Sequence, residues 1–81
     1  MPKCELCGRW TNLETHHLMN GNGLRKRADE DGLVIKVCRD CHNKIHANSA
    51  LRLELKRRAQ HRYMSTHSLE EWMARYHKNY L

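Results

Sequence analysis

The 81-residue chain has no phenylalanine, and its aromatic side chains are two tryptophans and three tyrosines. Apolar residues make up 40% of it, and a chain of this length buries only about 60% of its unfolded surface. The hydrophobic core is therefore small. Chains of this size usually gain further stability from disulfides, a bound metal or oligomerisation. We expect one of these to stabilise a single domain that spans residues 1–81.

The sequence also lacks a run of about 18 apolar residues, and it does not open with a charged segment followed by an apolar one. These absences predict an intracellular protein with no membrane partner. In a reducing compartment, paired Cys-x-x-Cys motifs bind zinc far more often than they form structural disulfides.

Acidic residues are few, since nine Asp and Glu stand against fifteen Lys and Arg, which gives a formal net charge of +6. Four thiolates on one Zn²⁺ would lower this charge to about +4. The basic balance favours a polyanionic partner such as nucleic acid.

Two short segments have the composition of β-strands. Residues 13–19 and 33–37 are rich in apolar or β-branched side chains and are bounded by turn formers. We expect them to pair antiparallel. Residues 20–32 between them contain three glycines and six charged side chains, which predicts a long exposed loop with a function.

Helical spacing begins at Cys41 and continues over about 48–63. Asn48 and Ser49 could cap a second helix, or one helix could run through, and the sequence leaves this open. One stripe of the segment is apolar, and its opposite face is basic. The apolar stripe comprises Leu51, Leu55, Ala59 and Tyr63.

A capping box predicts a last helix over about 69–78, because Ser68 is followed three residues later by Glu71. We expect its apolar face to complete the core. Trp10 and Trp72 are expected in the core rather than as platforms for stacked bases. The apolar face of the last helix comprises Leu69, Trp72, Met73 and Tyr76.

Two cysteine pairs have the spacing of a zinc site. Cys4 and Cys7 form one Cys-x-x-Cys motif, Cys38 and Cys41 form the other, and 30 residues separate them. Four thiolates fill a tetrahedron around Zn²⁺ and leave no position for water. Gly8 allows a tight turn beneath the first pair. We therefore predict a structural zinc site whose loss unfolds most of the protein.

Four histidines remain for a second ion if the sulfurs hold the zinc. His42 and His46 stand at i and i+4 on one helix face. His16 and His17 lie on the first predicted strand, which the zinc would hold against that helix. Three or four imidazoles are then expected to converge, although adjacent histidines could also arise by chance. We expect the other histidines at the surface, namely His61, His67 and His77.

Three motifs in this order strongly resemble the HNH endonucleases: Cys4-x-x-Cys7, Glu14-Thr15-His16-His17 and Cys38-x-x-Cys41-His42-x-x-x-His46. The resemblance implies a small α+β fold. Its ββα-metal motif would be an antiparallel hairpin and a helix on a treble-clef-like Cys4 zinc site, over residues 1–46. Residues 47–81 would form a helical C-terminal extension. The whole chain is also similar to small HNH proteins encoded near phage and prophage genes.

The resemblance implies hydrolysis of DNA phosphodiester bonds, by nicking or double-strand cleavage, with low sequence specificity. It makes His17 the general base, while His16, His42 and His46 bind one catalytic divalent ion, which could be Mg²⁺, Mn²⁺, Ni²⁺ or Zn²⁺. The products would carry a 5′ phosphate and a 3′ hydroxyl. The location it implies is the cytoplasm of a bacterium or a phage-infected host.

Two features depart from a regular member of the family. Its middle Asn is missing, and near the equivalent place stand Asp29, Asp31 and Gly32, of which Asp31 could brace the loop only as an acceptor. Consecutive strand residues also point to opposite faces, so His16 and His17 serve one site only if the strand ends or bulges there.

Seven basic side chains are predicted to contact DNA phosphates, which would give affinity without sequence readout. Alternatively, these seven side chains form only a solvated surface. A phage or host protein could direct the chain, a monomer or a homodimer, to DNA. The alternative function is a catalytically inactive zinc-stabilised module that binds DNA or protein. The seven residues are Arg25, Lys26 and Arg27 in the loop and Arg52, Lys56, Arg57 and Arg58 on the following helix.

Overall fold

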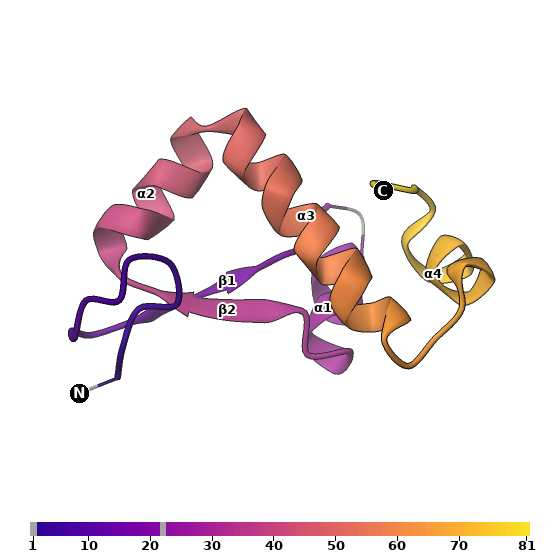
Figure 1. Cartoon of the computed structure of the whole chain (residues 1–81), viewed down its shortest axis with the longest axis horizontal. Coiled ribbons are helices and arrows are strands. Elements are labelled where there is room, and N and C mark those ends of the chain that lie inside the picture. The colour runs from indigo at the N-terminus through magenta and orange to yellow at the C-terminus, as the bar shows by residue number, and fades with distance from the viewer. Residues whose placement is uncertain (1, 22) are drawn as a thin grey trace.

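The computed structural model describes residues 2–21 and 23–81 and has a two-stranded antiparallel sheet beneath helices (Figure 1). Strand β1 is Glu14–His17, and strand β2 is Val34–Val37. Glu14 lies opposite Val37, and His17 lies opposite Val34. The predicted hairpin is confirmed, with both strands shorter than predicted, the first by three residues and the second by one.

The connection between the strands is not an open loop, and this prediction was wrong. Helix α1, Leu24–Glu30, occupies most of it, while position 22 lies outside the described residues. Leu24 and Ala28 are one helical turn apart, and Ala28 is fully buried. Gly23 precedes the helix at φ 78°, a conformation that glycine adopts without strain. The apolar pair and the helix-forming charged residues around it were the missed signal.

Two helices follow the hairpin and form an inverted V above it (Figure 1). Helix α2 is Arg39–Ala47, and helix α3 is Ser49–Met64. The open question is settled in favour of two helices, because the Asn48 side chain accepts a hydrogen bond from the Leu51 N–H at 3.0 Å and caps α3. The predicted apolar stripe of α3 packs into the core, where Leu55, Ala59 and Tyr63 are buried.

Helix α4, Leu69–Tyr76, begins with the predicted capping box. Trp72 is fully buried, and its indole N–H donates to the Lys78 carbonyl at 2.7 Å. Leu69 and Met73 remain exposed, so only part of the predicted apolar face completes the core. The helix packs beside α3 (Figure 1). The core that it completes also contains Leu18, Met19, Leu33, Ile35, Val37 and Ile45.

Asp31 attaches the end of the α1 segment to α4. Its Oδ2 accepts hydrogen bonds at 2.5 Å from Arg75 Nε and from the Tyr76 hydroxyl. Asp31 therefore braces the C-terminal end of α1 against α4. The carboxylate and burial together raise the pKa of Tyr76, burial being the larger cause.

Trp10 does not lie in the core, contrary to expectation, and 68% of it is exposed. It pairs through its backbone with Lys3 in an isolated bridge beside the first cysteine pair. Among residues 2–12 only Cys4 is buried, so this segment provides little packing for the indole. Within the described residues, no helix is both long and apolar enough to cross a membrane.

Candidate functional site

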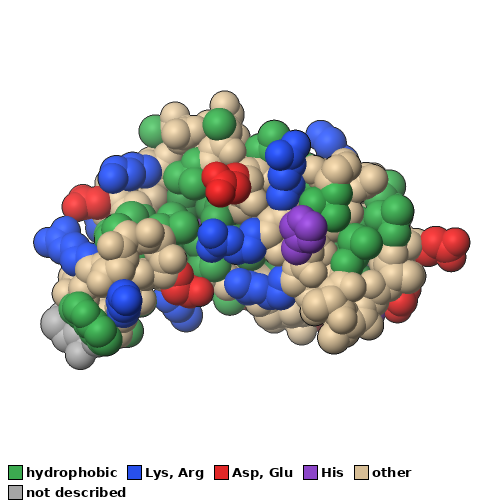
Figure 2. Space-filling view, in the orientation of Figure 1, with side chains coloured by type: hydrophobic (Ala, Val, Ile, Leu, Met, Phe, Trp, Pro, Cys, Tyr) green, Lys and Arg blue, Asp and Glu red, His purple; other side chains and the backbone are tan. Residues whose placement is uncertain are grey.

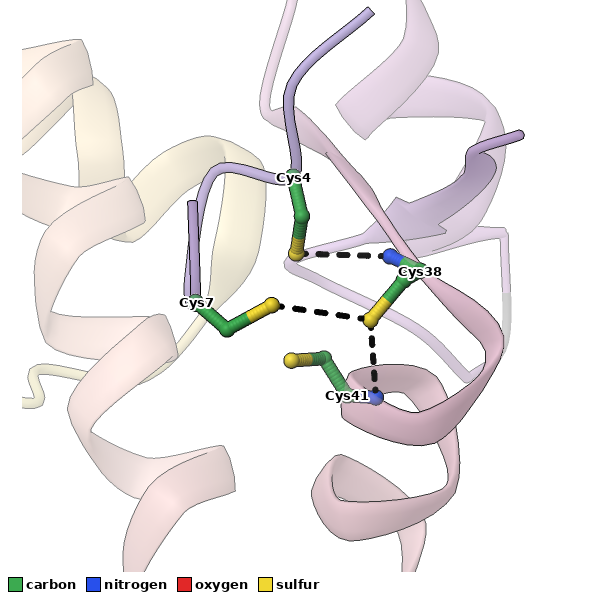
Figure 3. Close-up of side chains that lie close together, drawn as sticks. All are labelled: Cys4, Cys7, Cys38 and Cys41. Carbon is green, nitrogen blue, oxygen red and sulfur yellow. Dashed lines mark hydrogen bonds between the residues drawn. The ribbon is translucent and has the colours of Figure 1, made fainter. Parts of the chain in front are cut away.

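The four cysteines converge between the N-terminal segment, the end of β2 and the start of α2 (Figure 3). Their sulfur atoms all lie within 4.8 Å of one another. Cys38 caps α2, and Cys41 occupies its first turn, so the helix dipole favours thiolate at this point. All four are free thiols, with Cys7 and Cys38 Sγ atoms 3.7 Å apart. The cluster could hold a metal ion, as the spacing predicted.

Two sulfurs of the cluster differ in acidity. Burial by itself would raise the pKa of Cys4, but backbone N–H groups of Cys7 and Cys38 directed at its sulfur lower that pKa to about 6. Burial, together with the neighbouring sulfurs, raises the pKa of Cys41 to about 12. Four thiolates so close therefore need a cation, and binding one releases protons.

A second cluster contains His16 on β1 and His42 and His46 on α2. Each offers a ring nitrogen, and these nitrogens lie within 4.8 Å of one another. The ring centroids of His42 and His46 are 4.8 Å apart, as expected for neighbours on one helix face. His16 is buried, and its burial next to the two other imidazoles lowers its pKa to about 4. Its nitrogen is therefore neutral at pH 7 and free to bind a cation.

Glu14 orients one imidazole of this trio. His42 Nδ1 and Glu14 Oε1 are 2.7 Å apart, and Arg39 Nη2 lies 2.9 Å from the second carboxylate oxygen. The hydrogen bond from His42 and the charge of Arg39 lower the pKa of Glu14. Glu14 stands in the histidine motif without a predicted role. The available signal was its position two residues before His16, which places both on one strand face.

His17 lies outside the trio but beside the same cavity. This cavity of about 300 Å³ is lined by His16, His17, His42, His46 and Arg25, with Thr15 and Asn20. His17 Nε2 lies 2.7 Å from Asp29 Oδ1 on α1. Side chains alternate between the two faces within a strand, but β1 ends at His17. His16 and His17 therefore both line this one cavity.

The predicted phosphate contacts fall into two groups. Arg27, Arg52 and Arg57 donate to backbone carbonyls of α4, α2 and the C-terminal segment at 2.6, 3.0 and 2.9 Å respectively. Lys56 Nζ lies 5.6 Å from the centre of the Tyr80 ring. These four side chains therefore have structural contacts. The second group is free of side-chain hydrogen bonds and ion pairs within residues 2–21 and 23–81, and it comprises Arg25, Lys26 and Arg58.

Figure 2 shows Lys and Arg side chains spread over one face of the molecule, with acidic side chains between them. Arg25 differs from the other basic residues because it lines the cavity of the histidines. The remaining histidines, His61, His67 and His77, are exposed as expected.

Comparisons of the chain with protein-family models, curated proteins and solved structures found no match. Over residues 2–21 and 23–81 the chain is a small α+β protein with an antiparallel hairpin, four helices and a Cys4 cluster that could hold a metal ion.

We expect Glu14→Gln to weaken divalent metal binding at the histidine cluster by about 10- to 100-fold, because the carboxylate that fixes the His42 ring is lost. Titration of Ni²⁺ into the zinc-loaded protein, followed by calorimetry, would measure the change. Glu54→Gln is the matched control, since Glu54 is exposed on α3. Equal affinities in the two variants would contradict the role assigned to Glu14.

Proposed function

We propose that the protein is a metal-dependent endonuclease of the HNH type that hydrolyses DNA phosphodiester bonds. One observation carries the proposal: three imidazoles from β1 and α2 converge, and a fourth imidazole and Arg25 line the same cavity. Chance would not be expected to bring four of seven histidines to one cavity beside a separate cysteine cluster.

The histidine trio fits a divalent ion. Two ligands that each lie about 2.1 Å from one ion are up to about 4.2 Å apart, which is close to the 4.8 Å limit within which the ring nitrogens lie. His46 is exposed while His16 is buried, so the open side of the trio faces solvent and substrate. A bound ion would neutralise charge on the scissile phosphate and stabilise the leaving 3′ oxygen.

His17 is the proposed general base. Imidazole exchanges protons near neutral pH, so it can take a proton from the water that attacks phosphorus. The His17 side chain lines the cavity and is 14% exposed, so water can reach it. Arg25 on α1 would bind a neighbouring phosphate and help to place the backbone in the cavity.

The described basic residues support binding to the DNA backbone rather than to base edges. Arg25, Lys26 and Arg58 are dispersed over α1 and α3, as suits contacts to phosphates rather than to base edges. We propose low sequence specificity, with a phage or host protein directing the enzyme to its DNA. A monomer or a homodimer could act in this way.

Plasmid nicking tests the proposal. The purified protein, with bound zinc counted by mass spectrometry, is incubated with supercoiled plasmid and Mg²⁺, Mn²⁺, Ni²⁺ or EDTA. We expect nicking with at least one ion and none with EDTA. A folded protein that carries one zinc and shifts plasmid mobility without nicking under any condition would instead be a binding module.

A further inference from the structure

We infer that Asp29 is a positioning residue that holds the His17 imidazole through Nε2 and leaves Nδ1 as the proton acceptor. The inference rests on the proposed endonuclease function and adds a residue to its site. The sequence motifs assign Asp29 no contact with any histidine. Its role follows from where α1 places it.

The contact itself determines which ring nitrogen carries the proton. His17 Nε2 and Asp29 Oδ1 are 2.7 Å apart. A carboxylate oxygen only accepts hydrogen bonds, so Nε2 is the donor. In a neutral imidazole the other nitrogen then has the free lone pair. Within residues 2–21 and 23–81, Asp29 is the only hydrogen-bond partner of the His17 ring.

The scaffold behind Asp29 is fixed on both sides. Ala28, the preceding residue, is fully buried, and its carbonyl accepts from the Leu33 N–H at 2.8 Å. Leu33 in turn accepts from the Leu18 N–H at 2.9 Å, and Leu18 directly follows His17. The carboxylate and the imidazole are therefore carried by two segments that these backbone hydrogen bonds hold together.

The acidic neighbours of Asp29 have other partners. Glu30 lies 2.8 Å from Arg75 Nη2, and Asp31 accepts from Arg75 and Tyr76. Of three consecutive acids, only Asp29 contacts His17. This division supplies a matched control on the same helix, because Glu30→Ala removes the same charge without touching the histidine.

Loss of Asp29 should affect turnover and leave the fold intact. Its side chain is 62% exposed, and exposed ion pairs contribute little to stability. Without Asp29 the His17 ring could rotate. Its Nδ1 lone pair would then face the attacking water in a smaller fraction of the protein molecules, so kcat should fall. Binding of DNA and of the metal ion should not change, since Asp29 belongs to neither the trio nor the basic group.

The kinetic test compares wild type, Asp29→Ala, Asp29→Asn and Glu30→Ala in plasmid nicking. We expect Asp29→Ala to lower kcat by about 10-fold or more at unchanged KM. Asp29→Asn should recover part of this loss, because its amide oxygen accepts the same hydrogen bond. Glu30→Ala should nick like wild type. In a His17→Ala background, Asp29→Ala should have no further effect.

A spectroscopic test does not depend on activity. Nuclear magnetic resonance of the histidine ring nitrogens, at a pH where the rings are neutral, should show the His17 proton on Nε2, held against exchange with water. The signal should disappear in Asp29→Ala and persist in Asp29→Asn.

The two tests separate the inference from the proposed function. If the ring proton behaves as expected but wild type does not nick DNA, the endonuclease proposal fails and the link between Asp29 and His17 stands. The inference is overturned if the proton resides on Nδ1. It is equally overturned if wild type nicks DNA and Asp29→Ala nicks at the same kcat, or if its effect adds to that of His17→Ala.

Discussion

Complete removal of the zinc ion that we propose the four cysteines hold is expected to unfold most of the protein. The cluster joins the N-terminal segment, the end of β2 and the start of α2 (Figure 3). Structural zinc binding contributes about 10–16 kcal/mol in small zinc domains, whereas whole domains are stable by only about 5–15 kcal/mol. A small core without phenylalanine cannot replace a contribution of that size.

Far-ultraviolet circular dichroism during chelation measures this effect, with residual zinc counted by mass spectrometry. The helical signal should fall as zinc is lost, and Zn²⁺, but not Mg²⁺, should restore it. Cys41→Ser should give a protein that does not fold at any zinc concentration near stoichiometry. A native spectrum that persists after all zinc is gone would contradict the structural role of the cluster.

His17→Ala is expected to reduce plasmid nicking by about 10²- to 10⁴-fold, the usual contribution of general acid–base catalysis. The fold should be unaffected, because the one side-chain hydrogen bond of His17 among the described residues is to the exposed Asp29. Initial nicking rates with the best divalent ion, together with circular dichroism of the same samples, give the measurement.

His61→Ala is the matched control for this variant, since His61 is exposed on α3 and lies away from the cavity. It should nick at the wild-type rate. Wild-type nicking by His17→Ala would mean that another group accepts the proton, even if the protein is a nuclease. Loss of nicking in both variants would point to a general effect of histidine removal rather than to a role of His17 as the base.

Several parts of the structure were predictable because the signal is local. Ligand spacing within each Cys-x-x-Cys pair, the i and i+4 positions of His42 and His46, and the Ser68 capping box each involve residues within one turn. The hairpin was predictable from composition and from the turn formers at its ends. The convergence of His16 on α2 followed from one further step, because the cysteines join β2 to that helix.

Other parts depended on packing that no short pattern records. Residues 20–32 are rich in charges and glycine, which hid the spacing of Leu24 and Ala28, and only the structure shows that Ala28 is fully buried. Trp10 was expected in the core rather than as a stacking platform, yet its indole lies at the surface, in a segment (residues 2–12) where only Cys4 is buried. Arg27, Arg52 and Arg57 resemble phosphate ligands in sequence, and their contacts with backbone carbonyls appear only in three dimensions.

The sequence by itself determined the candidate ligand sets: which cysteines group together, which histidines remain, and how basic the chain is. The tertiary structure alone decided which acids serve those histidines, since Glu14 reaches His42 and Asp29 reaches His17 across 28 and 12 residues respectively. The physical reason is that metal-ligand spacing is a property of adjacent backbone positions. Side-chain partners at such separations depend instead on how α1, the hairpin and α2 pack together.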